Sequence, residues 1–258
     1  MTNRAFTDGS AGDVDYACIG QAYAIYRQPD PMIAAQILRA LGSARTVLNV
    51  GAGTGSYEPH DRNVTAVEPS ATMRAQRPHN RPLAIDAVAE SLPFPDRSFD
   101  AAMASFTVHQ WSDLDKGIAE LRRVTTGPIV ILAPDPDRIH DFWLTHYLPE
   151  TLDLELGRLP AISRLVHLLG ETSTVTPVPV PLNCTDGFTE AYYGRPERLL
   201  EQGVQRAMSS WTLTPAAAIS RFNIHFAAAL ASGDWDARFG ELRNQPTYTG
   251  SLRLIVRP

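Results

Sequence analysis

The chain has 258 residues, of which 44% are hydrophobic, so one large α/β domain, or a domain with a cap, has enough apolar side chains for a sizeable core. Its 28 acidic and 23 basic residues give a net charge of −5 without any basic run, which argues against nucleic acid as a partner. Because the sequence has no long apolar run and no signal-peptide pattern at its start, we expect a cytoplasmic protein that does not bind membranes.

The N-terminal part is expected to be helical. Aromatic residues at helical spacing predict a helix over residues 15–27. A second helix is predicted to begin at Asp30 and Pro31, an N-cap residue followed by a proline at the first helical position, and to end at Gly42.

The middle of the chain alternates apolar strands with helices, which predicts a parallel sheet with right-handed crossovers. Ser70 is expected to cap a short helix, and Ser112 or Asp113 a longer one that ends at Val124. The expected strands are residues 46–50, 64–67, 83–86, 99–104 and 128–132.

The second half is less regular and mostly helical. A helix over residues 159–169 is predicted to end at Gly170. Three prolines make residues 175–182 suitable only for an edge or irregular strand. Further helices are expected within residues 188–243, including 196–210 and 215–230, and a last strand over 252–256.

The most informative motif is the strand Val47–Val50, which runs into the alternating glycines of Gly51–Gly55. Glycine lets the backbone approach a ligand closely and adopt positive φ. A second strand ends on Glu68, whose carboxylate can accept both hydroxyls of a ribose, and ligands bind at the carboxyl ends of parallel strands. The pair therefore predicts a site for a nucleoside-containing cofactor.

The glycine spacing argues against a dinucleotide. The dinucleotide fingerprint is G-x-G-x-x-G followed by a full helix that holds the pyrophosphate, whereas this chain has G-x-G-x-G. Only residues 56–63 separate the glycines from the next strand, and Pro59 interrupts them. A cofactor without phosphate fits better, and a nicotinamide-dependent dehydrogenase is disfavoured.

The sequence resembles the class I S-adenosylmethionine (SAM)-dependent methyltransferases, in particular the small-molecule type 11 group. The resemblance covers about residues 40–135 and is carried by five motifs in the expected order: Leu48–Gly55, Ala66–Met73, Ala89–Asp100, Val108–Trp111 and Glu120–Val124.

The resemblance implies a Rossmann-like, mostly parallel sheet of seven strands with an antiparallel last strand and a helical lid. It also implies one SAM-dependent methyltransferase domain over residues 1–258. Within that domain we expect a helical lid over 1–42, a SAM-binding core over 43–135, and substrate-side helices with the last strands over 136–258.

Two positions depart from the family pattern. Asn49 stands where the family usually has an acid, so it lacks the charge that would face a cationic ligand. Val88 stands where the family often has an acid that binds the adenine amino group. Asp86 could replace that acid only if the strand end is rearranged, so we expect adenine to be recognised mainly by the Ala89 backbone and by packing.

Cofactor-binding residues follow from these motifs and from the resemblance. For Glu68 the alternative is a solvent-facing carboxylate, and for Met73 a core position. Arg27 is expected to hold the cofactor's carboxylate, unless it is a surface arginine. The predicted set is Tyr26, Arg27, Asn49, Gly51, Ala52, Gly53, Gly55, Glu68, Pro69, Met73, Ala89, Glu90 and Phe106.

Substrate-binding residues are predicted after the fourth and fifth strands and in the N-terminal helix. His109 is the candidate general base, because an ordinary histidine pKa suits proton removal near neutral pH; packing against ligand and a structural role are the alternatives. The stripe of Tyr16, Tyr23 and Tyr26 is predicted to cover the cofactor, with ordinary amphipathic packing as the alternative. The predicted substrate set is Tyr23, His109, Trp111, Trp143, His146 and Tyr147.

These features predict a SAM-dependent methyltransferase acting on a small molecule, such as a natural-product intermediate, with O-methylation favoured over C- or N-methylation. The alternatives are a cyclase-like SAM-binding enzyme without methyl transfer and a non-catalytic methyltransferase-like partner protein. Cys18 and Cys184 are expected to be free thiols in a reducing compartment, and no metal site is expected. We expect a monomer or homodimer.

Overall fold

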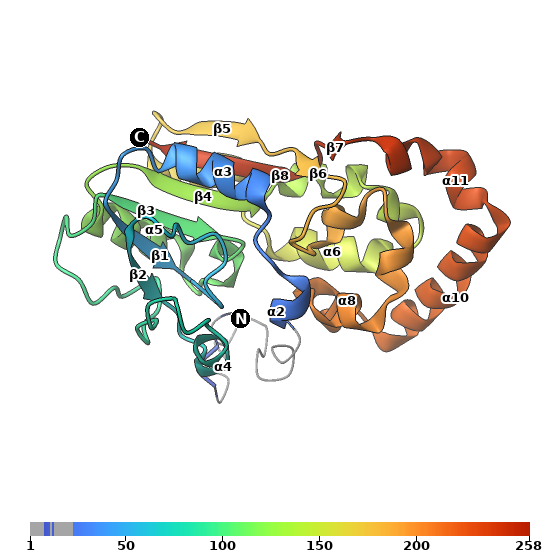
Figure 1. The fold of residues 1–258 in the computed structure, drawn as a ribbon, viewed down its shortest axis with the longest axis horizontal. Helices are drawn as coiled ribbons and strands as arrows, with labels where there is room; N and C mark the ends of the chain where they lie inside the picture. Colours follow the sequence, from blue (N-terminus) through green and yellow to red (C-terminus); the bar gives the residue numbers. More distant parts are fainter. Residues whose placement is uncertain (1–7, 11, 13–22) are drawn as a thin grey trace.

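The structure is a computed structural model that describes residues 8–10, 12 and 23–258 (Figure 1). Within these residues the central sheet has six strands in the order β2-β1-β3-β4-β8-β5. β1 to β4 are parallel, and β8 lies antiparallel between β4 and β5, which confirms the predicted Rossmann-like sheet with an antiparallel last strand. The strands are β1 (Thr46–Val50), β2 (Asn63–Val67), β3 (Ala101–Ser105), β4 (Ile129–Pro134), β5 (Thr174–Pro177) and β8 (Leu252–Arg257).

The strand predicted over residues 83–86 is reduced to a single bridge between Val67 and Ile85. The Ile85 N–H donates to the carbonyl of Ala66 at 2.8 Å, and the Ile85 carbonyl accepts from the N–H of Glu68 at 3.0 Å. Leu83 is 89% exposed, so no apolar contact holds the start of this segment against the sheet. The described sheet therefore has one strand fewer than the family resemblance implied.

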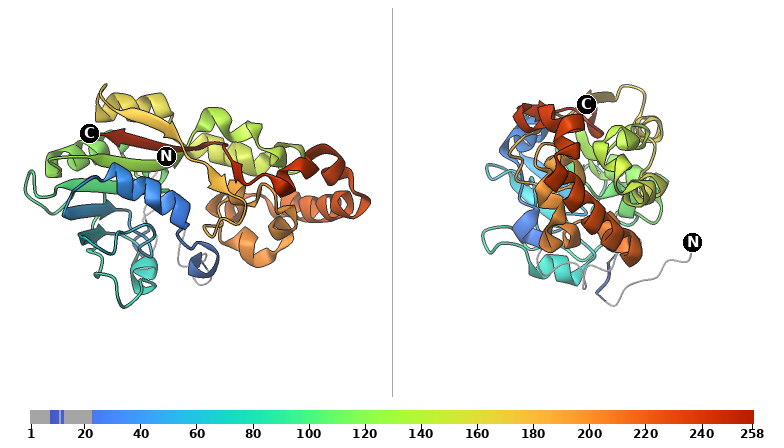
Figure 2. Two further views of the ribbon diagram at one scale, coloured as in Figure 1. Left: turned by 45° about the horizontal axis from the view of Figure 1, so that its top comes forward. Right: turned by 90° about the vertical axis from the view of Figure 1, so that its right-hand side faces the viewer.

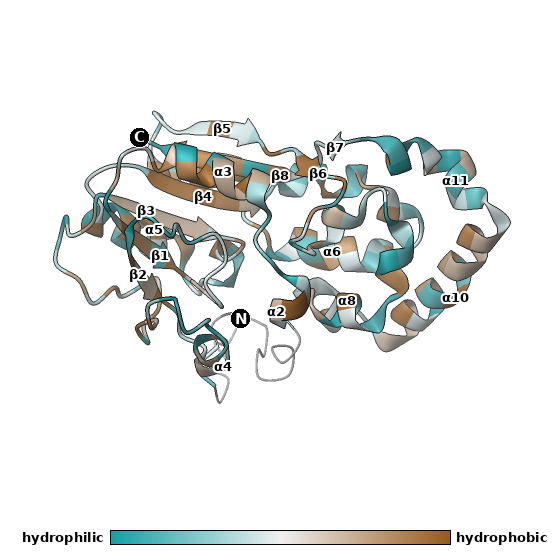
Figure 3. Cartoon of the chain, viewed as in Figure 1, coloured by the Kyte–Doolittle hydropathy of each residue, from teal (hydrophilic) through white to brown (hydrophobic). Residues whose placement is uncertain are grey.

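Helices cover both faces of the sheet (Figure 2). Leu48 of β1 belongs to a core with α5 (Leu114–Val124) and α7 (Ile162–Leu169) on one face. Its neighbour Val47 belongs to a core with α3 (Pro31–Ala40) on the other face. Strands buried on both faces need apolar residues at successive positions, and Figure 3 shows this hydrophobic character along β4.

Three predicted helix starts are confirmed by their capping hydrogen bonds. The side chains of Asp30, Ser70 and Asp113 accept backbone N–H groups two or three residues ahead, at 2.9, 3.2 and 3.0 Å. They precede α3, the short α4 (Ala71–Ala75) and α5, and satisfy N–H groups that a helix leaves open at its first turn. Gly42 follows α3 with φ +58°, as expected for a residue just past a helix end.

A helical region lies beyond the carboxyl ends of the parallel strands (Figure 1). An aromatic core holds it together, in which the rings of Trp143 and Phe226 stack with their centroids 5.3 Å apart. Its α-helices are α2 (Tyr23–Tyr26), α6 (Pro149–Arg158), α8 (Gln202–Arg206), α9 (Ser209–Leu213), α10 (Ala216–Ser232) and α11 (Asp234–Phe239). The 3₁₀ segments η3 (Pro136–Asp141), η4 (Trp143–His146), η5 (Thr189–Tyr192), η6 (Pro196–Leu200) and η7 (Gly240–Asn244) join them, with the short strand pair β6 (Val180–Pro181) and β7 (Thr247–Tyr248).

The structure differs from the sequence expectations at the predicted helix over 196–210, which is divided among η6, α8 and α9. The proline-rich segment 175–182 was expected to suit only an edge or irregular strand, and it provides the edge strand β5 and the short strand β6. Helix α6 was not predicted, because Leu152, Leu154 and Leu156 recur at a spacing of two, which is the period of a strand.

A buried ion pair supports the loop that follows β1. Arg77, just after α4, donates to both carboxylate oxygens of Glu58 at 2.9 Å, and the two side chains are 2% and 0% exposed. Arg77 also donates to the Gly53 carbonyl at 3.3 Å, and the Asn49 amide donates to Glu58 at 3.0 Å. Through these two contacts, the Glu58–Arg77 pair holds the glycine loop and the end of β1 in place.

We expect Arg77→Met to lower the free energy of unfolding by about 3–5 kcal/mol, because it leaves the buried Glu58 carboxylate without its cation. The double variant Glu58→Gln/Arg77→Met buries no charge at this place and should lose less. Urea unfolding of the three proteins measures this. A double variant at least as unstable as the single one would show that the uncompensated charge is not the cause.

Candidate functional site

The three glycines after β1 adopt the backbone conformation that the sequence predicted for them. Gly51, Gly53 and Gly55 have φ values of +68°, +51° and +94°. A Cβ atom on Gly51 would lie 2.0 Å from Oγ1 of Thr107, a residue of the segment after β3. Any larger residue at position 51 would therefore meet both a steric clash and an unfavourable φ.

Gly51 and Gly53 border a cavity of about 860 Å³ at the carboxyl ends of β1, β2 and β3, which we call the glycine-loop cavity. Its position is the one that parallel α/β sheets use for ligands. Eleven of the predicted cofactor residues line it: Arg27, Asn49, Gly51, Ala52, Gly53, Glu68, Pro69, Met73, Ala89, Glu90 and Phe106.

Glu68 is held rigidly at the end of β2. One carboxylate oxygen accepts the Gly53 N–H and the other accepts the Ser70 N–H, both at 2.8 Å. The residue is 7% exposed and lines the glycine-loop cavity. Burial raises the pKa of Glu68, and the two backbone bonds oppose that shift. Each oxygen keeps a further lone pair for a ligand hydroxyl.

The two departures from the family pattern have structural consequences. The Asn49 amide is bound to Glu58, whose charge Arg77 already balances, so the end of β1 adds no net charge to the cavity. Val88 lines the cavity with an apolar side chain. Asp86 is directed to Arg74 at 3.0 Å and does not line the cavity, so the rearrangement that would let it bind adenine does not occur.

The glycine-loop cavity contains a buried carboxylate that was not predicted from the sequence. Asp186, which is 2% exposed, lines the glycine-loop cavity. It accepts the Arg27 Nε–H at 2.5 Å and the Tyr57 hydroxyl at 2.8 Å. Asp186 follows an irregular segment and is 129 positions from Tyr57, so no local sequence pattern connects the two. Asp186 and Arg27 thus form a buried ion pair that lines the cavity.

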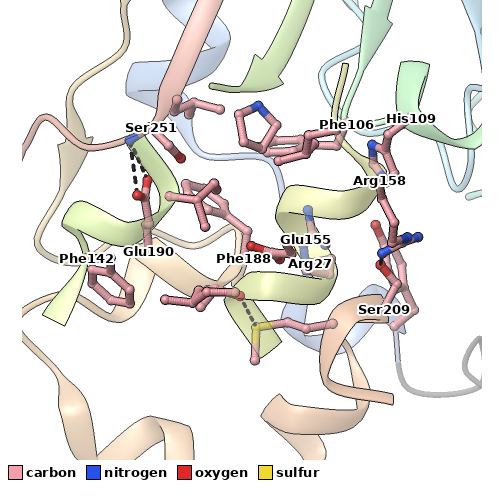
Figure 4. Close-up of a pocket in the computed structure, with 18 residues that line it drawn as sticks. Arg27, Phe106, His109, Phe142, Glu155, Arg158, Phe188, Glu190, Ser209 and Ser251 are labelled. Atoms are coloured by element: carbon pink, nitrogen blue, oxygen red, sulfur yellow. Dashed lines mark hydrogen bonds between the residues drawn. The ribbon is translucent and has the colours of Figure 1, made fainter. Parts of the chain in front are cut away.

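A second cavity of about 900 Å³ adjoins the first, and we call it the aromatic cavity (Figure 4). Its apolar wall consists of Pro134, Ile139, Phe142, Leu152, Leu159, Phe188, Met208 and Leu252. Its polar groups are His109, Glu155, Arg158, Thr189, Glu190, Ser209 and Ser251. An apolar wall with a few polar groups is typical of small-molecule sites.

Tyr23, Arg27 and Phe106 line both cavities and so form their junction. Phe106 has φ +54°, an uncommon conformation for a residue with a side chain. Its ring lies 5.2 Å from the ring of Phe188 and 5.3 Å from the Arg27 guanidinium carbon. Backbone strain of this kind is maintained where the surroundings fix a side chain in place, often at functional sites.

His109 lines the aromatic cavity but differs from the expectation for a general base. Burial, with the nearby positive charges of Arg158 and Arg27, lowers the pKa of His109 to about 3. The imidazole is therefore neutral near pH 7 and too weakly basic to remove a proton efficiently there. Its Nδ1 is buried and has no hydrogen-bond partner among the described residues.

The structure does not bring Trp143, His146 and Tyr147 to either cavity. Trp143 is 4% exposed and its indole N–H donates to the carbonyl of Tyr193 at 2.9 Å. Tyr147 packs edge-on against the Trp143 ring, and His146 stacks on Phe239. All three pack in or against the aromatic core of the helical region, away from the residues that line the two cavities.

Trp111 lines the glycine-loop cavity and packs beneath Gly117 of α5. Gly55 faces the Glu58–Arg77 pair, and the Tyr26 ring faces Gly203 of α8, so neither lines a cavity. Tyr16 lies outside the described residues.

In the described part of the chain, no helix combines the length and apolar character needed to cross a bilayer. No group of three or more histidine, cysteine, aspartate or glutamate side chains in this part has an arrangement that would hold a metal ion.

Comparison with known proteins agrees with this geometry. Residues 48–127 match the model of a methyltransferase domain family. A malonyl-[acyl-carrier protein] O-methyltransferase of Erwinia billingiae is 35% identical over 129 residues, which are 47% of this chain and 51% of that protein. A ubiquinone/menaquinone biosynthesis C-methyltransferase of Bartonella bacilliformis is 33% identical over 32% of this chain and 35% of its own length. The chain thus spans about half, or less, of the length of these curated relatives.

A solved structure resembles almost the whole chain. It is a protein of Anabaena variabilis assigned as a methyltransferase of an antibiotic biosynthesis pathway, with a TM-score of 0.84 and 29% identity over 90% of this chain and 99% of that one. Residues 48–127 thus match a methyltransferase domain, and almost the whole chain has the fold of the class I SAM-dependent methyltransferases, whose methyl donor is SAM.

Proposed function

We propose that the chain transfers a methyl group from SAM in the glycine-loop cavity to a small molecule in the aromatic cavity. The observation that carries this proposal is the junction, because Tyr23, Arg27 and Phe106 face both cavities. Bound SAM supplies a methyl group on a positively charged sulfur. When the acceptor takes the methyl group, the sulfur becomes a neutral thioether. The protein's main task is then to align donor and acceptor, which accounts for about 7–11 kcal/mol of a barrier in well-oriented reactions.

The direction of the cofactor follows from the charges of the glycine-loop cavity. Glu68 at the end of β2 suits the ribose, and Ala89 with Val88 suits the adenine beyond it. Arg27 and Asp186 lie at the junction side, where a cation and an anion side by side suit the amino-acid end of SAM. This orientation directs the sulfur toward the aromatic cavity.

Glu155 of α6 favours a hydroxyl as the methylated group. The Ser210 hydroxyl donates to it at 2.8 Å, and Glu155 lines the aromatic cavity. Burial raises the pKa of Glu155, although Ser210 and the nearby Arg158 and Arg27 oppose the shift. A carboxylate with a raised pKa is a stronger base than an exposed one, so Glu155 suits removal of a hydroxyl proton during transfer.

The resulting proposal is O-methylation of a small molecule of mainly apolar character, such as a natural-product intermediate. The assignment of the Anabaena relative to an antibiotic pathway supports the natural-product part. A screen of phenols, alcohols and amines with SAM radiolabelled on the methyl group tests the proposal. Label in an oxygen-linked product supports it; binding of SAM without transfer to any compound class would favour the cyclase-like or non-catalytic alternatives.

We expect Glu68→Gln to weaken binding of S-adenosylhomocysteine by about 1–3 kcal/mol, because a charged acceptor of the ribose hydroxyls is lost. Glutamine keeps one acceptor for the loop N–H groups, so it disturbs the fold less than alanine would. Calorimetry with an analogue that lacks the ribose hydroxyls should show little difference between variant and wild type. The control Asp86→Asn removes an acid outside the cavity and should bind normally. Unchanged affinity of Glu68→Gln would refute the ribose role.

The ring of His109 is expected to stay neutral down to about pH 4, since its pKa is lowered to about 3. In a pH titration followed by NMR, its ring signal should therefore not change near pH 6.5, where exposed histidines titrate. Because the folded pKa is below the unfolded one, His109 should also cost stability as the pH falls below about 6.5, and His109→Gln should remove that loss. A ring that titrates near pH 6.5 would restore His109 as the candidate base.

We expect Glu155→Gln to lower kcat for a hydroxyl acceptor by about 10²–10⁴-fold, the usual contribution of a general base, with unchanged binding of S-adenosylhomocysteine. An amine that is already neutral needs no such base and should be methylated at nearly the normal rate. Glu150→Gln, at an exposed ion pair on the same helix, is the matched control. Full turnover of a hydroxyl acceptor by Glu155→Gln would exclude this role.

A further inference from the structure

Glu190 is a buried acid at one end of the aromatic cavity. It belongs to η5, is 5% exposed and lines the cavity. Both carboxylate oxygens lie 3.0 Å from the Ser251 nitrogen, whose N–H they accept. Figure 4 shows Glu190 and Ser251 on one side of the cavity and His109 and Arg158 on the other. Because Phe106 at the junction lies toward His109, Glu190 is at the end remote from the methyl donor.

No ion pair within residues 23–258 neutralises this carboxylate. Arg27, which lines the same cavity, is paired with Asp186. Arg253 is engaged by Asp135 at 3.3 Å and donates to the carbonyls of Gly250 and Leu252. Burying a carboxylate without a counter-charge costs free energy. A bound ligand that carries a positive charge would offset this cost.

The groups that face Glu190 from neighbouring elements do not remove this cost. Glu155 of α6 is a second acid on the same cavity and raises the pKa of Glu190 further, whereas Arg253 of β8 lowers it. Tyr248 of β7 is held in its neutral form, because burial and the Glu190 charge raise its pKa. Burial is the largest cause of the shift, and the pKa of Glu190 is raised to about 7.

We propose that the methyl acceptor carries an ammonium group that binds Glu190, so that the cavity selects organic cations with an apolar body. This inference rests on the proposed function, because it takes the aromatic cavity as the acceptor site. An ammonium ion supplies both the missing positive charge and donors for the free lone pairs of the carboxylate. A neutral hydroxyl supplies a donor but leaves the negative charge uncompensated.

The position of Glu190 also separates recognition from reaction. The bound ammonium lies away from the junction and has no lone pair for methylation, so it anchors the molecule. Phe188 lines the cavity between the two ends and Phe142 lines it beside Glu190, and both rings suit the apolar body (Figure 4). The methylated group is then a second group of the same molecule, near Phe106 and Glu155. The acceptor class is therefore an amine with an aromatic or aliphatic body and a hydroxyl group.

Three probes of similar shape and different charge test the proposal: 4-phenylbutylamine, 4-phenylbutan-1-ol and 4-phenylbutyrate. Each is titrated by calorimetry at pH 8 into the full chain saturated with S-adenosylhomocysteine. We expect the amine to bind at least tenfold more tightly than the alcohol, and the carboxylate to bind most weakly. In Glu190→Gln the advantage of the amine over the alcohol should disappear. Glu241→Gln, an exposed residue with the same charge change, should keep it.

The dependence on pH gives a second readout. The amine stays an ammonium ion throughout, so its affinity should rise several-fold from pH 6 to pH 8 as Glu190 loses its proton, and this rise should be absent in Glu190→Gln. Equal binding of amine and alcohol by the wild-type protein, or an amine advantage that survives in Glu190→Gln, would overturn the proposal. Loss of S-adenosylhomocysteine binding or of label transfer would instead count against the proposed function.

Stability distinguishes a binding role from a structural one. The folded pKa of Glu190 is above its unfolded value, so its favourable contribution at low pH is lost as the pH rises from about 4.5 through about 7. Glu190→Gln removes this loss, and its Tm at pH 8 without ligand should equal or exceed that of the wild type. A clearly lower Tm at pH 8 would mean that Glu190 holds the Ser251 segment in place and would contradict a site kept for a ligand.

Discussion

The contact between Arg27 and Asp186 determines how the two cavities meet. It joins the end of α2 to the segment that precedes η5, and through Tyr57 it also reaches the loop after β1. These three segments come from distant parts of the sequence, and the Asp186 carboxylate joins them by accepting hydrogen bonds from Arg27 and Tyr57. The same Arg27 guanidinium lies 5.3 Å from the centre of the Phe106 ring, so the contact also supports a residue of the junction.

Repulsion between buried acids limits which residues can lie beside Glu58 near the glycine loop. A carboxylate at position 49 would be close to Glu58, and two buried acids there would repel each other. The chain instead has an amide at 49 and pairs Glu58 with Arg77. The Asp186 carboxylate, which also lines the cavity, is likewise paired with a cation, Arg27. The amide at Asn49 thus avoids an unpaired acid beside Glu58.

The local features of the SAM-binding half could be predicted from the sequence because neighbouring residues determine them. The strands β1 and β2, the caps Asp30, Ser70 and Asp113, and the positive φ values of the loop glycines all depend on residues within a few positions. The position of Glu68 followed from a motif of the same kind. The strand over 83–86 was over-predicted, since periodicity does not reveal that Leu83 lacks a covering layer.

The acceptor side could not be predicted in this way. Three of its polar groups, Glu155, Glu190 and Ser251, come from α6, η5 and the segment before β8, and only the tertiary fold brings them together. Aromatic residues misled the sequence analysis for the same reason. Trp143 and Tyr147 have the composition of a binding site, but they fill the core that supports the helical region. The pKa of His109 likewise depends on Arg158 and Arg27, which are far away in the sequence.

A crystal structure of the chain with S-adenosylhomocysteine tests the central claim most directly, because the claim concerns the direction in which the cofactor lies. We predict ribose hydroxyls on Glu68, the amino-acid end beside Arg27 and Asp186, and the sulfur at Phe106 with the aromatic cavity open beyond it. A cofactor that lies the other way, with its sulfur toward Ala89 or its amino-acid end away from Arg27, would contradict the account.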